Sequence, residues 1–204
     1  MKLHYLPGAC SLAAHIALRE AGLDFDLDKM DRSTPVKKTQ SGDDYLQVNP
    51  KGQVPVLRLD GQGVLTECAV ILQYVADQKP GSGLAPAAGT MERYRLQEWL
   101  NWVASDLHKI FGPLFRPTTP EAYVAITMDL LAQRYTYLDQ HLATHPFLMG
   151  DKFTVADAYC FTIMNWARVK KVDLSPYTHL KAYVERVAAR PKVQEAMRAE
   201  GLIQ

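Results

Sequence analysis

The sequence predicts an α/β domain followed by an all-α domain, and three observations support this fold class. Short apolar runs alternate with helical periodicity through residue 79. Residues 80–90 are rich in proline, glycine and alanine, a composition typical of linkers. From residue 91 onward only long amphipathic patterns follow. We therefore expect an α/β domain over 1–79, a linker over 80–90 and an all-α domain over 91–204.

The first domain is expected to hold a small mixed sheet of four strands with helices around it. Short apolar runs with turn residues at their ends predict the strands, and Gly22 ends the first helix. Asp60–Gly63 joins the last two strands. The expected strands cover residues 2–6, 25–30, 56–59 and 64–65, and the expected helices cover residues 11–21, 43–48 and 67–77.

The second domain is expected to be a bundle of amphipathic helices. These helices cover residues 91–115, 120–145, 155–169, 176–189 and 191–200. Thr154 and Asp157 form a capping box with aspartate in place of glutamate, and Phe153 precedes it as a hydrophobic staple. We interpret this motif as a helix start with a structural role.

The segment Asn49–Leu57 places a proline where a buried strand should begin. Pro55 has no N–H for a sheet ladder, so it belongs at a strand's first residue or at an edge. A cis Val54–Pro55 bond would resolve this conflict and leave the N–H and C=O of Val54 available to a peptide-like ligand. The sequence therefore predicts a ligand-binding edge at Val54.

Composition and charge narrow the class of partner. The 204 residues are 48% hydrophobic and carry a formal net charge of +1, which gives no attraction to nucleic acid or to an anionic membrane. No stretch approaches the ~18 apolar residues of a membrane span, and His4 and Pro7 interrupt the start before a signal-peptide core could form. Cys10, Cys68 and Cys160 are odd in number and widely spaced, as free thiols in a reducing compartment would be. We expect a cytoplasmic protein.

Several motifs resemble those of one family along essentially the whole chain. They are Pro7–Leu12, Gly42–Tyr45, Asn49–Val56, Glu98–Asn101, Leu107–Lys109 and Phe153–Tyr159. With the order of elements, they resemble the cytosolic glutathione transferases, and specifically the bacterial beta class, which carries cysteine where other classes carry catalytic tyrosine or serine. The resemblance implies a thioredoxin-like N-terminal domain, glutathione as co-substrate and a homodimer.

Cys10 is the candidate nucleophile. It lies between the first strand and the helix from Ser11, where free N–H groups and the helix dipole favour a thiolate. Without the motif, a cysteine at such a place is more often a small packing residue. The resemblance implies that Cys10 takes the catalytic place, so Tyr5 is expected to be core.

Glu67 and Cys68 begin a helix for which Thr66 is the expected N-cap. The N–H groups of its first turn are suited to a carboxylate. By resemblance, Glu67 binds the α-amino group of glutathione and Cys68 supplies an N–H. The simpler interpretation of Glu67 is a first-turn glutamate that only complements the helix dipole. Cys68 departs from the family's glycine or serine, and its nearness to Cys10 suggests a redox partnership.

Three further residues complete the expected glutathione site of the first domain. By resemblance, a lysine meets the glycyl carboxylate, and register relative to Gly42 favours Lys37 over Lys38. Adjacent surface lysines are otherwise most often solvated. Gln53 and Val54 complete the peptide-like edge.

Asn101, Ser105 and His108 are spaced four and three residues apart, which predicts one inward-facing polar stripe on the helix from Met91. A lone histidine is by default a surface or satisfied core residue. The resemblance implies that His108 lies near the glutathione sulfur, as a hydrogen-bond donor or proton shuttle. It also implies that Ser105 and Asp106 reach the ligand of the other subunit, so that dimerisation completes the site.

An apolar wall is expected for a small hydrophobic electrophile. Its candidates, each of which alone would more often be core, are Phe111, Leu114, Phe115 and Trp166. The six histidines lack zinc spacing, and the sequence contains no phosphate loop, so we expect no metal.

The sequence thus predicts a glutathione transferase that conjugates the glutathione thiolate to small hydrophobic electrophiles, a detoxification reaction. One alternative is a glutathione-dependent thiol–disulfide or reductive enzyme, glutaredoxin-like or dehalogenating, in which Cys10 itself attacks. The other is a non-catalytic binder of hydrophobic ligands, because a fold does not fix a function.

Overall fold

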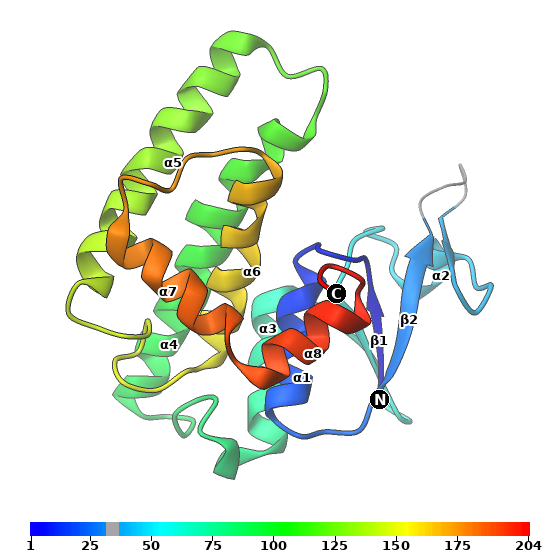
Figure 1. Cartoon of the computed structure of the whole chain (residues 1–204). Coiled ribbons are helices and arrows are strands. Elements are labelled where there is room, and N and C mark those ends of the chain that lie inside the picture. The colour runs from blue at the N-terminus through cyan, green and yellow to red at the C-terminus, as the bar shows by residue number, and fades with distance from the viewer. Residues whose placement is uncertain (32–36) are drawn as a thin grey trace. The chain divides into compact units, whose positions relative to one another are not determined.

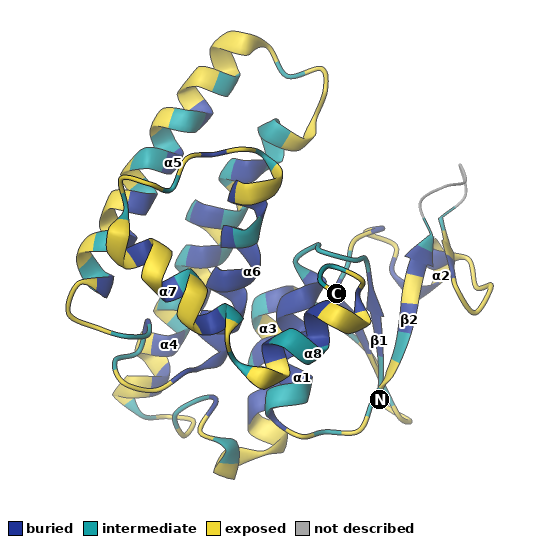
Figure 2. Cartoon of the chain, viewed as in Figure 1, coloured by how far each residue is buried: buried dark blue, intermediate teal, exposed yellow. Residues whose placement is uncertain are grey.

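The computed structural model describes residues 1–31 and 37–204 (Figure 1). These residues form two compact units, one of residues 1–85 together with 190–204, the other of residues 86–189. The first boundary follows Ala85 and lies within the proline- and glycine-rich stretch. Each unit has its own buried core, as the dark residues of Figure 2 show, and each is described by itself below.

The first unit is built on a mixed sheet in which the described residues form five strands, in the order β3-β2-β1-β4-β5. The strands are β1 (Lys2–Tyr5), β2 (Asp26–Asp31), β3 (Lys38–Thr39), β4 (Val56–Leu59) and β5 (Gly63–Thr66). β1 runs parallel to β2 and antiparallel to β4, so the sheet is mixed as expected. The expected count of four strands is wrong, because the sequence analysis missed β3. This strand has only two residues, which is too short for a period-two pattern.

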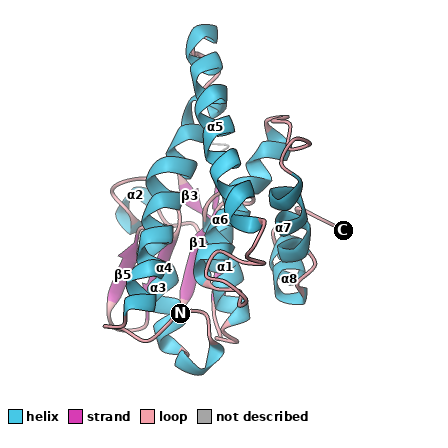
Figure 3. Ribbon diagram, turned by 90° about the vertical axis from the view of Figure 1, so that its left-hand side faces the viewer, coloured by secondary structure: helices cyan, strands magenta, loops and turns pink. Residues whose placement is uncertain are grey.

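Helices cover one face of this sheet. α1 (Ser11–Glu20) and α3 (Cys68–Gln78) pack against each other and lie over the strands in Figure 3, whereas α2 (Tyr45–Val48) is a single turn that packs on Met30 of β2 and Val56 of β4. A short 3₁₀ turn, η1 (Pro80–Ser82), follows α3. Leu12 and Ile71 are fully buried beneath the two long helices. Burying each such side chain stabilises the fold by ~1.5–3 kcal/mol, which holds α1 and α3 in place in the first unit.

The last helix, α8 (Pro191–Ala199), packs against α1 in the first unit. The sequence predicts that this segment belongs to the all-α domain, whereas in the structure it forms one compact unit with residues 1–85. Val193 and Met197 form the buried stripe, and Arg190 holds the carboxylate of Glu20 at 2.7 and 2.8 Å. An amphipathic pattern shows that a helix has an apolar face but not which surface that face covers.

The second unit is entirely helical over its described residues. It contains α4 (Met91–Trp102), η2 (Val103–His108), η3 (Lys109–Phe115), α5 (Glu121–Leu142), α6 (Val155–Val169) and α7 (Thr178–Ala188). α6 is buried along most of its length and packs on α4, η2 and α7 (Figure 2). The single helix expected over 91–115 changes from α to π over Val103–His108 and then to 3₁₀. No helix of the described residues is long and apolar enough to cross a membrane.

Asp157 fixes the start of α6. Its carboxylate accepts hydrogen bonds from the N–H and Oγ of Thr154, at 2.8 and 3.0 Å, as the predicted structural motif requires. It also accepts from the N–H of Leu148 at 2.8 Å and from the hydroxyl of Tyr183 at 3.2 Å. Burial raises the pKa of Asp157 to about 6, while these donors act in the opposite direction.

Candidate active site

Cys10 immediately precedes α1 and lies partly exposed at the helix N-cap. Its thiol donates a hydrogen bond to the carbonyl oxygen of Val54, with 3.2 Å between sulfur and oxygen. The Val54–Pro55 bond is cis, as the sequence predicted. Two residues predicted to share one site are therefore in direct contact, although 44 positions separate them in the chain.

The electrostatic environment of Cys10 differs from the expectation. Burial of the sulfur raises the pKa of the Cys10 thiol to about 12, and the carboxylate of Glu67 adds to that rise. The backbone N–H groups of Cys10 and Ser11 lower the pKa, as a helix start should, but desolvation outweighs them. Desolvation thus opposes the expected thiolate, and the Cys10 thiol donates to Val54 in this geometry.

Side chains behind the edge hold its backbone in place. The carbonyl of Gln53 accepts from the hydroxyl of Tyr45 and from the amide of Asn49, each at 2.7 Å. Nζ of Lys37 donates to the carbonyl of Gly52 at 3.1 Å, so the predicted lysine lies at the same edge. The sequence analysis missed the role of Tyr45, because a buried tyrosine on a one-turn helix gives no signal of its hydroxyl's partner.

The start of α3 lies beside Cys10. Glu67, and not the expected Thr66, is the N-cap residue, since Thr66 ends β5. Glu67 has a φ of 69°, a left-handed conformation that costs about 1–3 kcal/mol in a residue other than glycine and is typical of functional sites. Its exposed carboxylate pairs with Lys51, which also donates to Oγ of Thr66 at 3.0 Å.

Cys68, the first residue of α3, is only 7% exposed. Its thiol donates to the carbonyl oxygen of Cys10 at 3.5 Å. The first N–H groups of a helix lack partners within the helix, so the start of α3 presents donors beside the Cys10 thiol. The first unit thereby brings together Cys10, Val54 and Cys68, with Glu67 next in sequence.

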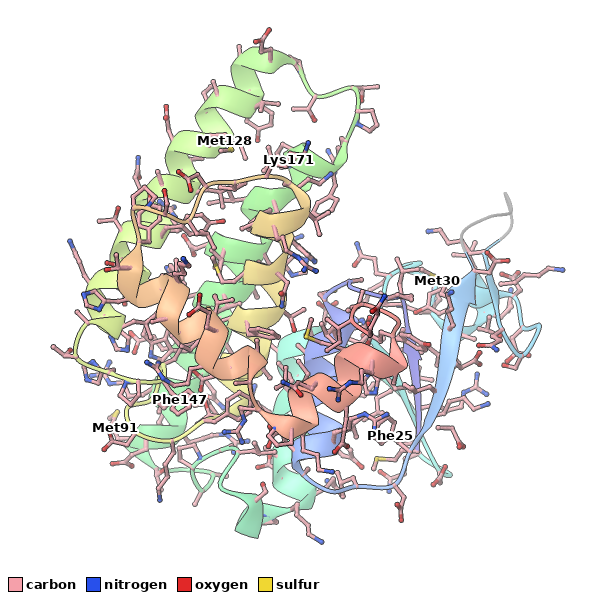
Figure 4. The ribbon with its side chains drawn as sticks, in the orientation of Figure 1. Phe25, Met30, Met91, Met128, Phe147 and Lys171 are labelled. Carbon is pink, nitrogen blue, oxygen red and sulfur yellow. The ribbon has the colours of Figure 1, made fainter. Side chains whose placement is uncertain are left out.

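A buried carboxylate supports the loop before Cys10. Glu200 accepts from the N–H of Gly8 and pairs with Nδ1 of His15, each at 2.9 Å. Arg19 donates to the other ring nitrogen of His15 at 2.9 Å, which assigns the Nδ1 proton to the side facing Glu200. Phe25, labelled in Figure 4, closes this cluster with its ring 5.6 Å from that of His15. The sequence analysis missed Glu200, because its partners lie far away along the chain.

The second unit contains a cavity of about 510 Å³. Phe115 and Trp166, two of the four predicted wall residues, line it together with His108. Phe111 is fully buried behind Trp166, with ring centroids 5.7 Å apart, so it supports the wall from within the core. Leu114 is half-buried and is not among the residues that line this cavity, so its place in the wall stays a prediction. The remaining lining residues are Lys109, Ile110, Gly112, Pro113, Arg116, Tyr123, Thr127 and Leu130.

His108 faces this cavity from the end of η2. Its Nδ1 lies 2.7 Å from the hydroxyl of Tyr159, and its ring makes an edge contact with Trp166 at 4.9 Å. Burial lowers the pKa of His108 to about 4, with a further contribution from Lys109. The imidazole is therefore neutral at physiological pH, and Tyr159 fixes its orientation.

The expected inward polar stripe is wrong. Asn101 and Ser105 are exposed in this unit, and only His108 of the three turns inward. The π-helical turn inserts an extra residue between them, so spacings of four and three no longer fall on one face. Asp106 pairs with Arg134 at 3.3 Å and accepts from Oγ of Ser105 at 2.7 Å.

Each unit has a distinct chemical capacity. The first offers a thiol, a fixed backbone edge and the start of a helix, which suit a small thiol peptide with a carboxylate. The second offers an apolar cavity with one neutral imidazole. Within residues 1–31 and 37–204 there is no cluster of three histidine, cysteine or acidic side chains that could hold a metal ion.

Comparison with known proteins identifies the family of this chain. Residues 8–78 match the family model of the glutathione S-transferase N-terminal domain, and residues 100–191 match that of the C-terminal domain. The chain is similar to glutathione S-transferase GstA of Escherichia coli O157:H7, at 48% identity over 99% of this chain and 100% of that protein. The chain therefore belongs to the glutathione S-transferase family.

Two solved structures narrow the class. A sphingomonad glutathione S-transferase in complex with glutathione is 46% identical, with a TM-score of 0.95 and complete coverage of both chains. The bacterial beta-class enzyme of Sphingomonas chungbukensis is also 46% identical over both whole chains, with a TM-score of 0.94. This protein is a bacterial beta-class glutathione transferase, as its motifs predicted, with the expected thioredoxin-like and helical domains.

Proposed function

We propose that this enzyme binds glutathione along the edge of its first unit and adds the glutathione thiolate to small hydrophobic electrophiles. The observation that carries this proposal is the 3.2 Å hydrogen bond from Cys10 to Val54, beside the start of α3. It places a protonated thiol next to the backbone edge that a tripeptide would pair with. A bound thiolate at this point would accept the Cys10 hydrogen bond in place of Val54.

Glutathione is expected to lie with its γ-glutamyl end at the start of α3. Its carboxylate would bind the N–H of Cys68, and its α-amino group would bind the carboxylate of Glu67. The cysteinyl backbone would pair with Val54, next to Gln53, and Lys37 would meet the glycyl carboxylate. The fixed carbonyl of Gln53 supports this assignment, because a rigid edge loses little entropy on binding.

The electrophile is proposed to occupy the 510 Å³ cavity of the second unit, against Phe115 and Trp166. The thiol of glutathione gives up its proton, sulfur forms a bond to the electrophilic carbon, and the leaving group departs with its electron pair. Neutral His108 can accept that proton or donate to the sulfur. Detoxification of apolar compounds in the cytoplasm is the expected role.

The main test follows conjugation of glutathione to 1-chloro-2,4-dinitrobenzene by absorbance. Cys10→Ala removes the hydrogen-bond donor, so kcat is expected to fall about tenfold, the equivalent of ~1.4 kcal/mol. Cys10→Ser is the matched variant, because its hydroxyl still donates, and it should retain most of the rate. Full activity of Cys10→Ala would exclude Cys10 from conjugation.

A second candidate function is glutathione-dependent disulfide exchange or reduction with Cys10 as nucleophile. The partly exposed Cys10 sulfur at a helix start favours it. Here Cys10→Ser discriminates, because serine cannot form a mixed disulfide and disulfide reductase activity would vanish while conjugation persists. Calorimetry tests the third alternative, a non-catalytic ligand binder: without glutathione binding at millimolar concentration, neither catalytic function stands.

A homodimer is proposed as the working assembly. α4 exposes two large apolar side chains, Met91 (65%) and Tyr94 (57%), as an interface would. Asn101, Ser105 and Asp106 follow on the same segment and would serve the ligand of the partner subunit. Sedimentation analysis of the purified protein and of Tyr94→Glu, which places a charge on this surface, tests the assembly.

A further inference from the structure

Cys68 is a buried thiol for which the conjugation chemistry has no use. Its sulfur lies 3.5 Å from the carbonyl oxygen of Cys10, so the first residue of α3 contacts the backbone of the residue that caps α1. The two helices pack against each other, which holds this contact in place. The two cysteines are 58 positions apart in the chain, so only the tertiary fold pairs them.

The contact between Cys68 and the backbone of Cys10 brings two cysteines together that could form a disulfide. A disulfide requires Cα atoms about 4.4–6.8 Å apart and Cβ atoms about 3.5–4.5 Å apart. The sulfur of Cys68 lies against the backbone carbonyl of Cys10, so a bond between the two cysteines requires both side chains to turn toward each other. Cys10 would exchange its hydrogen bond to Val54 for the new bond.

Exposure gives the two thiols different roles. Cys10 is partly exposed and can meet a disulfide that arrives from solvent, whereas Cys68 is only 7% exposed behind it. Cys68 can therefore react only with a sulfur already attached to Cys10. Cys160, the remaining cysteine, is fully buried in α6 of the other unit and serves as an internal reference.

We propose that Cys68 is a resolving cysteine, which displaces glutathione from a Cys10–glutathione mixed disulfide and leaves a Cys10–Cys68 disulfide. The oxidant is glutathione disulfide, and the inference rests on the proposed function in that the same edge receives its glutathionyl group. In the first step the Cys10 thiol loses its proton and its sulfur attacks glutathione disulfide. One glutathione leaves as thiolate and takes up that proton.

In the second step the Cys68 sulfur attacks the Cys10 sulfur, the bond to glutathione breaks, and the second glutathione leaves with the proton of Cys68. Two thiols are oxidised and one glutathione disulfide is reduced to two glutathione molecules, so atoms and electrons balance. Burial raises the pKa of both thiols, which slows attack but also withholds the thiolate stabilisation that makes a disulfide easy to reduce.

Mass spectrometry of the intact protein tests this proposal. The full chain is incubated anaerobically with excess glutathione disulfide, then denatured in N-ethylmaleimide, which labels every remaining thiol. The wild-type protein is expected to carry one maleimide, on Cys160, and no glutathione. Cys68→Ser is expected to carry one maleimide and one glutathione, because its Cys10 adduct has no resolving thiol. Digestion without reductant should yield a peptide pair linked through Cys10 and Cys68.

Two controls keep the result interpretable. Cys160→Ser should form the same disulfide and carry no maleimide, while Cys68→Ala repeats the key variant in case serine disturbs the packing of α3. A glutathione adduct that is as stable in the wild type as in Cys68→Ser overturns the resolving role, as does a wild-type protein with three maleimides. Conjugation is measured in parallel on untreated wild type, so failure of the proposed function is seen separately.

Discussion

The backbone N–H of Gly8 donates to the carboxylate of Glu200 at 2.9 Å, which ties the loop before Cys10 to a residue 192 positions away, just after α8. The other carboxylate oxygen holds Nδ1 of His15 on α1. The Glu200 side chain is fully buried with that of His15. The loop before Cys10, the first helix and the segment after α8 thus share one buried carboxylate.

Glu200→Ala is expected to destabilise the protein by about 3 kcal/mol, because it leaves His15 and the Gly8 amide without their buried acceptor. Conjugation at saturating substrate should fall as well, since the loop before Cys10 loses its anchor. Chemical denaturation and initial rates measure the two effects. Glu98→Ala, at an exposed pair with Arg95 on α4, is the matched control and should leave the stability unchanged.

His108 is expected to make the folded state less stable in acid. Burial lowers its pKa from 6.5 to about 4, so between these values the unfolded chain binds more protons than the folded chain. The free energy of unfolding should therefore decrease as pH falls from 6.5 to 4. In His108→Gln this slope should be shallower by the contribution of one group. An NMR titration in which the His108 ring protonates near pH 6.5 would contradict the assignment.

Phe115→Ala is expected to weaken binding of the electrophile. Phe115 is 43% exposed and lines the cavity, so part of its ring is available to a ligand, although Nζ of Lys170 lies 4.1 Å from the ring centroid. Loss of ~1–2 kcal/mol of apolar contact should raise KM for the electrophile by about 5- to 30-fold, while KM for glutathione stays unchanged. Equal changes in both values would argue against a separate electrophile site.

Phe111→Ala provides the contrasting case on the same segment. Phe111 is fully buried behind Trp166, so its truncation leaves a core cavity and should lower the free energy of unfolding by about 3–5 kcal/mol. Phe115→Ala should leave that free energy nearly unchanged. Thermal denaturation of both variants therefore distinguishes Phe115, a residue of the cavity wall, from Phe111, a residue of the core.

Tyr45→Phe is expected to weaken glutathione binding, although the Tyr45 hydroxyl itself is not expected to contact glutathione. It removes the hydroxyl that holds the Gln53 carbonyl at 2.7 Å, and leaves Asn49 as the remaining donor described. A hydrogen bond worth ~0.5–1.5 kcal/mol corresponds to a rise in KM for glutathione of about 2- to 12-fold. The exposed Tyr137→Phe is the control. An unchanged KM in Tyr45→Phe would show that the edge needs only Asn49.

The sequence alone predicted those features that depend on neighbours along the chain. Pro55 predicted the cis bond because proline lacks a ladder donor, and Cys10 and Val54, predicted to share one site, are in contact. Val155–Val169 was predicted with the bounds that the structure has, since its capping box marks the start and its apolar period marks the length. Class-specific motifs then identified the beta-class family.

Tertiary structure alone decided what depends on distant neighbours. Desolvation, which no residue type encodes, raised the pKa of Cys10 and lowered that of His108. The π turn over Val103–His108 broke the phase that had placed Asn101 on an inward face. Glu200 reached its partners only because α8 packs on α1. The order of residues determines local features such as turns and helix starts, whereas burial and long-range pairing arise only when the whole chain is packed.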